Sequence, residues 1–162
     1  MNLLKPAVYL SALCLPFSVQ AESADALIAK GKVHANAFQE EDALKHFHAA
    51  EKLDGRNADL CAAISREYRH LMSEASSEKE KRRLGEIALR YAYRAAELAP
   101  GNPEAQLAPA ITLGKMLPLA NGSAEKLASS RGIKSSADKT IALDSKNDTA
   151  WHVLGRWHRG VA

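Results

Sequence analysis

The chain has 162 residues, a length that suits one domain with a modest hydrophobic core. Charged residues make up 25% of it and aromatic residues 6%, and alanine and leucine are abundant, a composition that favours an all-helical fold. The net charge of +3 is small and spread along the chain. It argues against a nucleic-acid-binding protein, because such proteins concentrate basic residues in a patch.

Residues 1–21 differ in composition from the rest of the chain. They contain one early lysine, Lys5, then an apolar run broken by Pro6 and Pro16, and they end with Val-Gln-Ala at Ala21. This pattern predicts a secretory signal peptide cleaved after Ala21, and therefore a periplasmic or secreted protein. An uncleaved N-terminal membrane anchor is the alternative, although the apolar run is shorter than the ~20 residues that a membrane-spanning helix needs.

An internal repeat begins directly after this segment and predicts one helical repeat domain over residues 22–162. In the first unit, Leu27 and Gly31 give a large and a small residue on a first helix. Ala43, Phe47 and Ala50 follow on a second helix, where small residues let two helices approach and the aromatic ring fills the gap. This spacing is typical of a tetratricopeptide repeat, so we expect an α-solenoid of antiparallel helix pairs.

Two further units follow the same pattern. The segments "EKLDGRN", "AELAPGN" and "IALDSKN" repeat one motif, in which a second helix ends and the next unit begins. The first unit spans Ala24 to Asn57, and the second and third, Ala58 to Asn102 and Pro103 to Asn147, are each 11 residues longer. We expect these two 11-residue insertions to lengthen the helices beyond an ordinary repeat.

Local signals place both insertions between the two helices of a unit. In the second unit, Ser77 and Glu80 have the spacing of a capping box, which predicts a helix start. In the third unit, Pro118 and the Asn121-Gly122 pair predict a break in the chain.

The final helix begins near Thr149. Trp151, Leu154 and Gly155 match the W-x-x-L-G signature of a first helix, so the repeat domain is expected to end midway through a fourth unit. Trp151, Leu154 and Trp157 lie at three-residue steps and share one broad face. We expect part of this face to pack near Ile141 and Leu143 and the rest to stay exposed, as a site for self-association or for a partner helix.

Two stretches carry a resemblance to a known family. "SREYRHLMSEASSEKEKRRLGEIALRYAYRAAEL" is a long helix pair with a charged break, and "NGSAEKLASSRGIKSSADKTIALDSKNDTAWHVLGRWH" keeps a Gly-Ile-Lys step, a turn and a Leu-Gly helix in family order. From about Ala24 to His158 the chain resembles the regulator of microtubule dynamics family, which implies an α-solenoid. With a Sec-type signal, the resemblance implies a bacterial relative, for which a microtubule role is not expected. Family members continue past "RWHRGVA", which implies a C-terminally truncated chain.

Catalytic and metal-binding motifs are missing from the sequence. No H-x-x-x-H or C-x-x-C spacing occurs among its histidines and cysteines, and no glycine-rich phosphate loop or nucleophile elbow is present. We therefore expect no metal, no cofactor, no small-molecule substrate and no enzymatic activity. An enzyme that uses Cys61 as a nucleophile is a less favoured alternative, and a buried helix residue is the simpler interpretation.

The first helices of a tetratricopeptide array line a groove that binds peptides. Repeat register assigns seven residues to this groove, namely Lys32, Asn36, Arg66, Arg69, His70, Arg156 and Arg159. The set is basic, which predicts a protein or peptide partner with acidic groups, although such residues are also common on solvated helix surfaces. The pair Ile28 and Lys32 stands where the known carboxylate-clamp repeats have a lysine and an asparagine.

The pattern as a whole predicts a non-enzymatic, exported scaffold that binds another protein. The alternatives are a truncated fragment of a longer repeat protein without a function of its own, and a membrane-anchored adaptor.

Overall fold

The computed structural model describes residues 22–161, and the predicted signal peptide lies outside these residues. Over this range the chain forms seven α-helices, one 3-10 helix and no strand. The elements are α1 (Ala24–Asn36), α2 (Glu40–Leu53), α3 (Ala58–Glu74), α4 (Glu78–Leu98), α5 (Pro103–Met116), η1 (Leu117–Leu119), α6 (Gly122–Leu143) and α7 (Asp148–Val161). The prediction of an all-α fold is confirmed.

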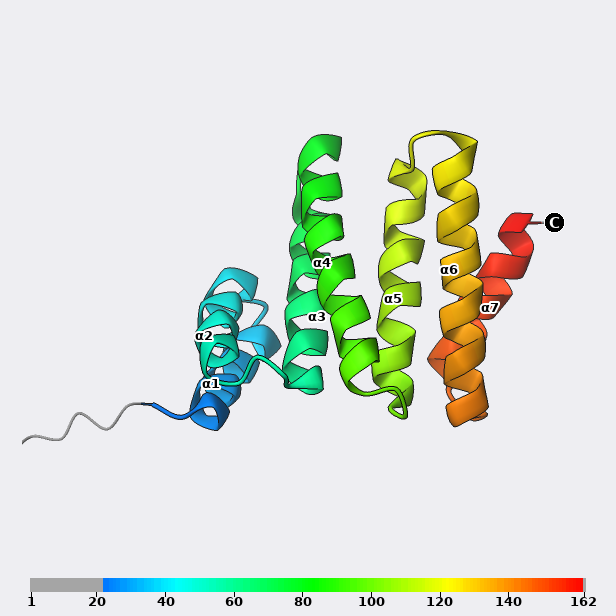
Figure 1. Ribbon diagram of the computed structural model, residues 1–162. Coiled ribbons are helices and arrows are strands. Elements are labelled where there is room, and N and C mark those ends of the chain that lie inside the picture. Colours follow the sequence, from blue (N-terminus) through cyan, green and yellow to red (C-terminus); the bar gives the residue numbers. More distant parts are fainter. Residues whose placement is uncertain (1–21, 162) are drawn as a thin grey trace, which may run out of the picture.

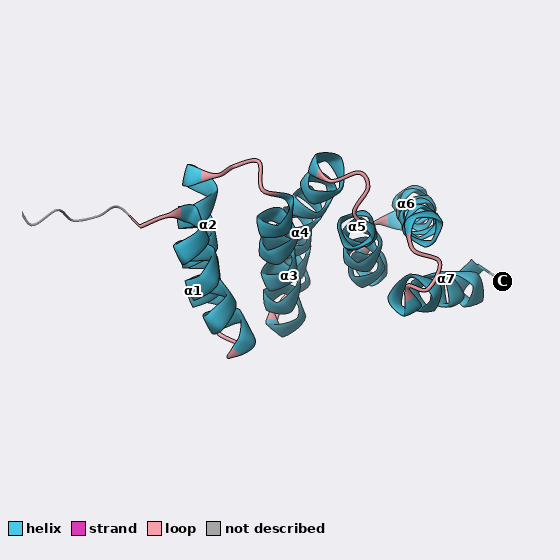
Figure 2. Cartoon of the chain, turned by 90° about the horizontal axis from the view of Figure 1, so that it is seen from below, coloured by secondary structure: helices cyan, strands magenta, loops and turns pink. Residues whose placement is uncertain are grey.

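The helices form two layers, each helix packing against its neighbours along the chain. Figure 2 shows α1, α3, α5 and α7 on one side and α2, α4 and α6 on the other, which is the arrangement of an α-solenoid. The second and third units are taller than the first, as the insertions predict: α4 has 21 residues and α6 has 22, against 14 in α2. Their extended ends rise above α1 and α2 in Figure 1.

Small residues hold the two layers together. Ala43, Ala50, Ala88 and Ala92 have no exposed surface, so the backbones of paired helices lie close to one another. The ring of Phe47 is also fully buried. It packs directly over Gly31, where a methyl group would stand 2.4 Å from a ring carbon. The predicted pairing of a small residue with an aromatic ring is therefore confirmed in the first unit.

Asparagines explain why the turn motif is repeated. The side chain of Asn57 accepts a hydrogen bond from the Leu60 amide at 3.0 Å, and that of Asn102 accepts one from the Glu104 amide at 2.9 Å. Asn147 does the same for the Ala150 amide at 2.9 Å. Each motif thus ends one unit and provides the N-cap of the next, which satisfies backbone donors at the helix start.

The predicted breaks within the insertions are also present. The Ser77 hydroxyl accepts a hydrogen bond from the Glu80 amide at 3.2 Å and begins α4, while the Glu80 carboxylate pairs with Arg83 at 2.6 Å. In the third unit Pro118 lies in η1. Gly122 then begins α6 with a φ of 79°, a conformation that glycine adopts readily.

None of the helices in residues 22–161 combines the length and apolar character that crossing a lipid bilayer requires.

Gly31→Ala is expected to lower the free energy of unfolding by about 1–3 kcal/mol, because the added methyl group overlaps the Phe47 ring. Gly155→Ala is the matched control: Gly155 has the same repeat position in α7, and a methyl group there meets no atom within 4 Å. The higher helix propensity of alanine should stabilise the control by up to about 1 kcal/mol. Thermal denaturation followed by circular dichroism measures both, and a Gly31→Ala protein as stable as wild type would contradict this packing.

Candidate functional site

The face formed by α1, α3, α5 and α7 carries the residues that repeat register assigns to a groove. Lys32 and Asn36 are exposed on α1, and Arg156 and Arg159 are exposed on α7. The central part of the face is formed by α3 and α5, which pack against each other. Its polar side chains, unlike those at the two ends, are held in defined positions.

Arg69 on α3 is the most constrained of these side chains. Its Nη1 donates to the Ser65 hydroxyl at 3.2 Å and to the Thr112 hydroxyl of α5 at 3.3 Å. Burial, with a smaller contribution from the positive charge of Arg66, lowers the pKa of Arg69 to about 10, so it stays protonated at neutral pH. In residues 22–161 no carboxylate lies within salt-bridge distance of Arg69. Within the described residues, this largely buried positive charge thus has only hydroxyl partners.

Lys115 on α5 adds a second positive charge that the register assignment missed. Its Nζ donates to the hydroxyl of Ser73 on α3 at 2.7 Å. Burial lowers the pKa of Lys115, and repulsion from Arg69 lowers it further. Lys115 occupies the place in its helix that Asn36 and His70 occupy in theirs, so extending the same count to the third unit would have found it.

Carboxylates of this chain accompany two other members of the predicted set. Arg66 Nε lies 3.1 Å from an oxygen of Glu67, whose side chain is almost fully buried. His70 Nδ1 lies 3.7 Å from a carboxylate oxygen of Glu40. In residues 22–161, Arg66 and His70 therefore lie beside carboxylates, whereas the side chains of Arg69 and Lys115 donate to hydroxyl groups.

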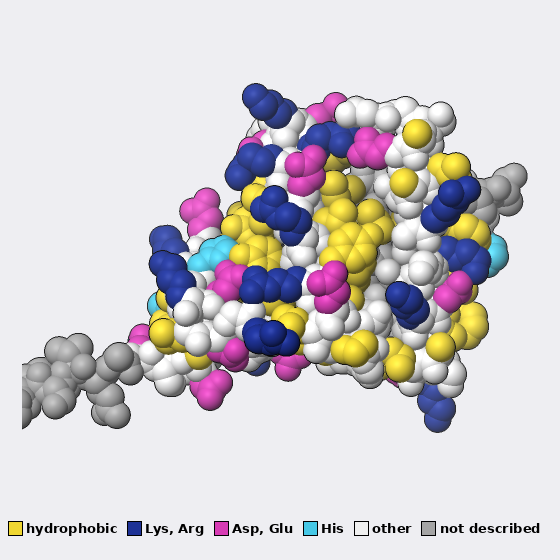
Figure 3. Space-filling model, in the orientation of Figure 1, with side chains coloured by type: hydrophobic (Ala, Val, Ile, Leu, Met, Phe, Trp, Pro, Cys, Tyr) yellow, Lys and Arg dark blue, Asp and Glu magenta, His cyan; other side chains and the backbone are white. Residues whose placement is uncertain are grey.

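Positive charge is not confined to this face. Figure 3 shows the opposite face, that of α2, α4 and α6, where Lys and Arg side chains lie over α4 among acidic ones and apolar surface lies on either side. Positive charge alone therefore does not distinguish the groove from the rest of the surface. The distinguishing feature is that Arg69 is largely buried with no carboxylate partner among residues 22–161.

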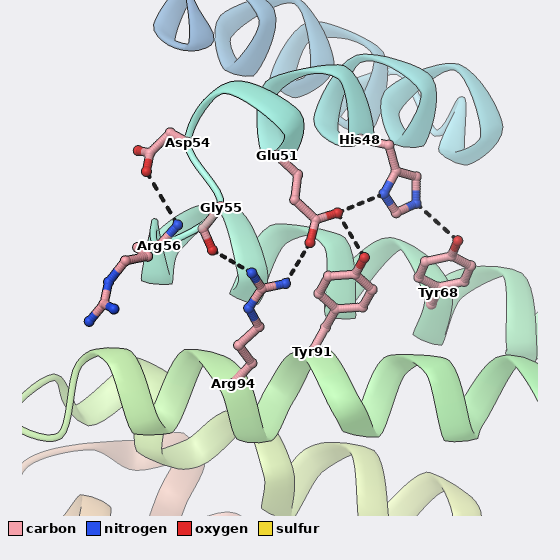
Figure 4. A network of polar contacts seen from close by, with 8 residues as sticks. All are labelled: His48, Glu51, Asp54, Gly55, Arg56, Tyr68, Tyr91 and Arg94. Carbon is pink, nitrogen blue, oxygen red and sulfur yellow. Dashed lines mark hydrogen bonds and ion pairs between the residues drawn. The ribbon is translucent and has the colours of Figure 1, made fainter.

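A polar network joins the first unit to the second on this opposite side (Figure 4). The carboxylate of Glu51 on α2 accepts hydrogen bonds from Tyr91 Oη at 2.8 Å and from Arg94 Nη1 at 2.6 Å, and lies 3.1 Å from His48 Nδ1. His48 Nε2 in turn lies 3.0 Å from Tyr68 Oη. Burial acts to raise the pKa of Glu51, but the surrounding donors outweigh it and lower that pKa. The network is suited to fixing the angle between units.

The aromatic residues of α7 do not share one environment. Trp151 is half exposed, and its indole N–H donates to the Ser145 carbonyl at 2.9 Å. Leu154 is partly buried. Trp157 is also partly buried, packs against the core between α5 and α6, and donates to the Ser130 carbonyl at 2.9 Å. Trp157 is expected on an exposed face but is partly covered, because α6 packs against its ring and the Ser130 carbonyl accepts its indole N–H.

Cys61, the alternative nucleophile, is 1% exposed. Burial raises the pKa of its thiol, which disfavours the reactive thiolate. In residues 22–161 no three side chains among His, Cys, Asp and Glu gather as metal ligands would.

Comparison with known families bears on these observations. The family model described as "Regulator of microtubule dynamics protein 1-3" matches residues 21–162. The chain belongs to this family. The resemblance to the regulator of microtubule dynamics family, inferred from two long stretches of the sequence, is confirmed. The chain matched no curated protein significantly.

Solved structures support the same fold for this regulator of microtubule dynamics family member. One is the first tetratricopeptide domain of Spaghetti (RPAP3) bound to the HSP90 peptide SRMEEVD, with a TM-score of 0.69 and 14% identity over 86% of this chain and 93% of that one. Another is the Arabidopsis OM64 tetratricopeptide domain, with a TM-score of 0.66 and 17% identity over 85% of this chain and 96% of that one. The fold is a tetratricopeptide-like solenoid, an architecture typical of protein-interaction scaffolds.

Glu51→Gln is expected to lower the free energy of unfolding by about 1–3 kcal/mol at neutral pH. The free energy of unfolding of the variant should also change less than that of wild type as the pH is lowered. The pKa of Glu51 is lowered in the folded state, so its carboxylate stabilises the fold above its ordinary pKa of 4.5, and this contribution is lost as the pH falls through the folded pKa. Melting temperatures measured from about pH 3 to pH 7 should therefore fall more steeply for wild type than for the variant.

Tyr91→Phe provides the control for this experiment, because it removes one donor to Glu51 and keeps the carboxylate. The fall in its melting temperature between about pH 7 and pH 3 should be smaller than that of wild type and larger than that of Glu51→Gln. Parallel curves for all three proteins would contradict the assigned role of the network.

Proposed function

We propose that this protein is a non-enzymatic, exported scaffold that binds an acidic segment of a protein partner along the face of α1, α3, α5 and α7. The observation that carries this proposal is Arg69, a largely buried cation with hydroxyl partners at 3.2 and 3.3 Å and no carboxylate partner in the described residues. A carboxylate from a partner would supply the missing countercharge. Lys115 stands on the adjacent helix, so a bound segment would meet a second cation.

The structurally similar tetratricopeptide domain of Spaghetti was solved with the HSP90 peptide SRMEEVD, so a protein of similar fold binds a peptide. This chain would bind its partner through different residues. Ile28 stands where the carboxylate-clamp repeats have their lysine, whereas Arg69 and Lys115 lie further along the first helices of the second and third units. The partner of this chain would therefore differ in how its acidic groups are spaced.

Export is proposed from the sequence of residues 1–21. The early lysine, the short apolar run and the small residue at Ala21 support cleavage after Ala21 and a periplasmic or secreted location. A bacterial source fits the same segment. A scaffold retained at the membrane by an uncleaved segment is the alternative.

The first test is capture of a partner from a periplasmic extract by the tagged protein, with the mass of the recovered chain reporting cleavage after Ala21. Arg66→Glu, an exposed substitution on α3, should reduce the captured partner about ten-fold or more, because reversing a charge at the surface repels an acidic segment. Arg90→Glu, at a residue of α4 that is also exposed and lies in the opposite layer, is the control and should leave capture unchanged.

Equal loss with both variants would contradict binding along this face. Failure of the wild-type protein to retain any partner at micromolar concentrations would count against the scaffold function itself.

Self-association through α7 is a second proposal, which rests on the half-exposed indole of Trp151. Trp151→Glu should shift the protein toward monomer in sedimentation velocity at tens of micromolar, and His152→Glu, on an exposed neighbour, is the control for added charge. Trp157 is unsuitable for this test because it packs against the core. A wild-type protein that sediments as a monomer would refute the proposal.

A further inference from the structure

A small pocket lies between η1 and the ends of α3, α4 and α5. These helix ends are at the top of Figure 1. The volume of the pocket is about 260 Å³, close to the lower end of the range of roughly 300–1,000 Å³ for ligand pockets. It is an open depression, since Ser73, Lys115 and Pro118 are exposed, and its size suits a group about as large as one amino-acid residue. It is lined by Met72, Ser73, Lys81, Lys115, Pro118 and Leu119.

The lining combines two kinds of surface. Two of the lining residues, Lys81 and Lys115, are basic and Ser73 carries a hydroxyl, whereas Met72, Pro118 and Leu119 are apolar. None of the six lining residues is a carboxylate. The pocket therefore suits a ligand that carries a negative charge beside an apolar group.

The ammonium group of Lys115 is held in place. Its Nζ donates to the Ser73 hydroxyl at 2.7 Å, and that hydroxyl donates to the Arg69 carbonyl at 3.0 Å. An ammonium group has three N–H donors, so Lys115 keeps donors for a ligand after bonding Ser73. The bond to Ser73 orients the ammonium group of this exposed lysine, which reduces the entropy lost when an anion binds.

Arg69 lies one helical turn before Ser73 on α3, and its positive charge acts on Lys115. In the described residues neither Arg69 nor Lys115 forms an ion pair, which leaves a local excess of positive charge beside the pocket. A bound anion would relieve this repulsion.

The apolar wall is anchored to the rest of the fold. Met72 is 5% exposed and belongs to a buried cluster with Leu84 and Met116. Arg82 on α4 donates to the Leu119 carbonyl and pairs with Glu125 on α6 at 2.8 Å, which holds η1 beside α4. These contacts hold η1, which carries Pro118 and Leu119, in one place beside α4.

We propose that this pocket binds the C-terminal residue of the protein partner, with its carboxylate at Lys81 and Lys115 and an apolar side chain against Met72, Pro118 and Leu119. A chain terminus fits because one residue then carries both the carboxylate and the apolar group, whereas an Asp or Glu side chain brings only the carboxylate. The inference rests on the proposed function, because it concerns the same partner: the acidic segment would lie along the groove, and the C-terminal residue would bind in this pocket.

The test is a titration of the ¹⁵N-labelled protein with three defined peptides, followed by amide chemical shifts. The first is acetyl-Gly-Ser-Gly-Ser-Leu with a free carboxylate, the second its C-terminal amide, and the third the same peptide ending in Gly. The first peptide should shift the amides of Ser73, Lys81, Lys115 and Leu119, and the other two should bind at least about ten-fold more weakly, because each lacks one of the two recognised groups.

Lys81→Gln combined with Lys115→Gln should abolish these shifts, and Lys79→Gln, an exposed lysine of α4 outside the pocket, should not alter them. Equal affinity for the amide, shifts unaffected by the double substitution, or no shift at millimolar peptide would overturn the inference. The same amides shifting with dihexanoyl phosphatidic acid but not with the peptide would also overturn it, in favour of a lipid phosphate. Peptide binding without any partner captured from extract would uphold the pocket and refute the proposed function.

Discussion

The close approach of paired helices is the constraint on which the rest of this structure depends. Fully buried alanines on α2 and α4 let neighbouring backbones pack closely. Gly31 has no side chain, which leaves room for the ring of Phe47. The same closeness positions the central polar residues. Ser65 has no exposed surface and donates from its hydroxyl to the Ala88 carbonyl of α4 at 2.8 Å, so its lone pairs are available to accept from Arg69. The orientation of the buried cation thus follows from the packing of α3 on α4.

The fold could be predicted from the sequence because its determinants are local. Helix ends depend on side chains within three residues, as at Asn57 and Asn102, and a count along the chain finds them. The helix-pair spacing depends on small residues at fixed intervals, which are equally visible. The placement of both insertions followed from Ser77 and Pro118 in the same way.

The candidate site could be predicted only in part, since register gives the position of a residue on its helix and not the partners that reach it from the next unit. Register places Arg69 on the face of α1, α3, α5 and α7, but it does not reveal that Thr112, from another unit, accepts a hydrogen bond from it. The three-residue spacing places Trp157 on an exposed face, but Ser130 of α6 provides an acceptor for its indole N–H. These contacts depend on the angle between successive units, which no short motif encodes.

The connections between helices have a consequence for how the chain folds. Every helix packs mainly on elements adjacent to it in sequence, and each of the three asparagine-capped turns can form without the rest of the molecule. Little loop-closure entropy is therefore lost before native contacts are gained, and folding should be fast for a chain of this length. The same connectivity limits cooperativity: within residues 22–161 the first and last units contact a neighbour on one side only, and such units open at a lower free energy than those between. The central pair α3 and α4, with contacts on both sides, is where hydrogen exchange of backbone amides should be slowest.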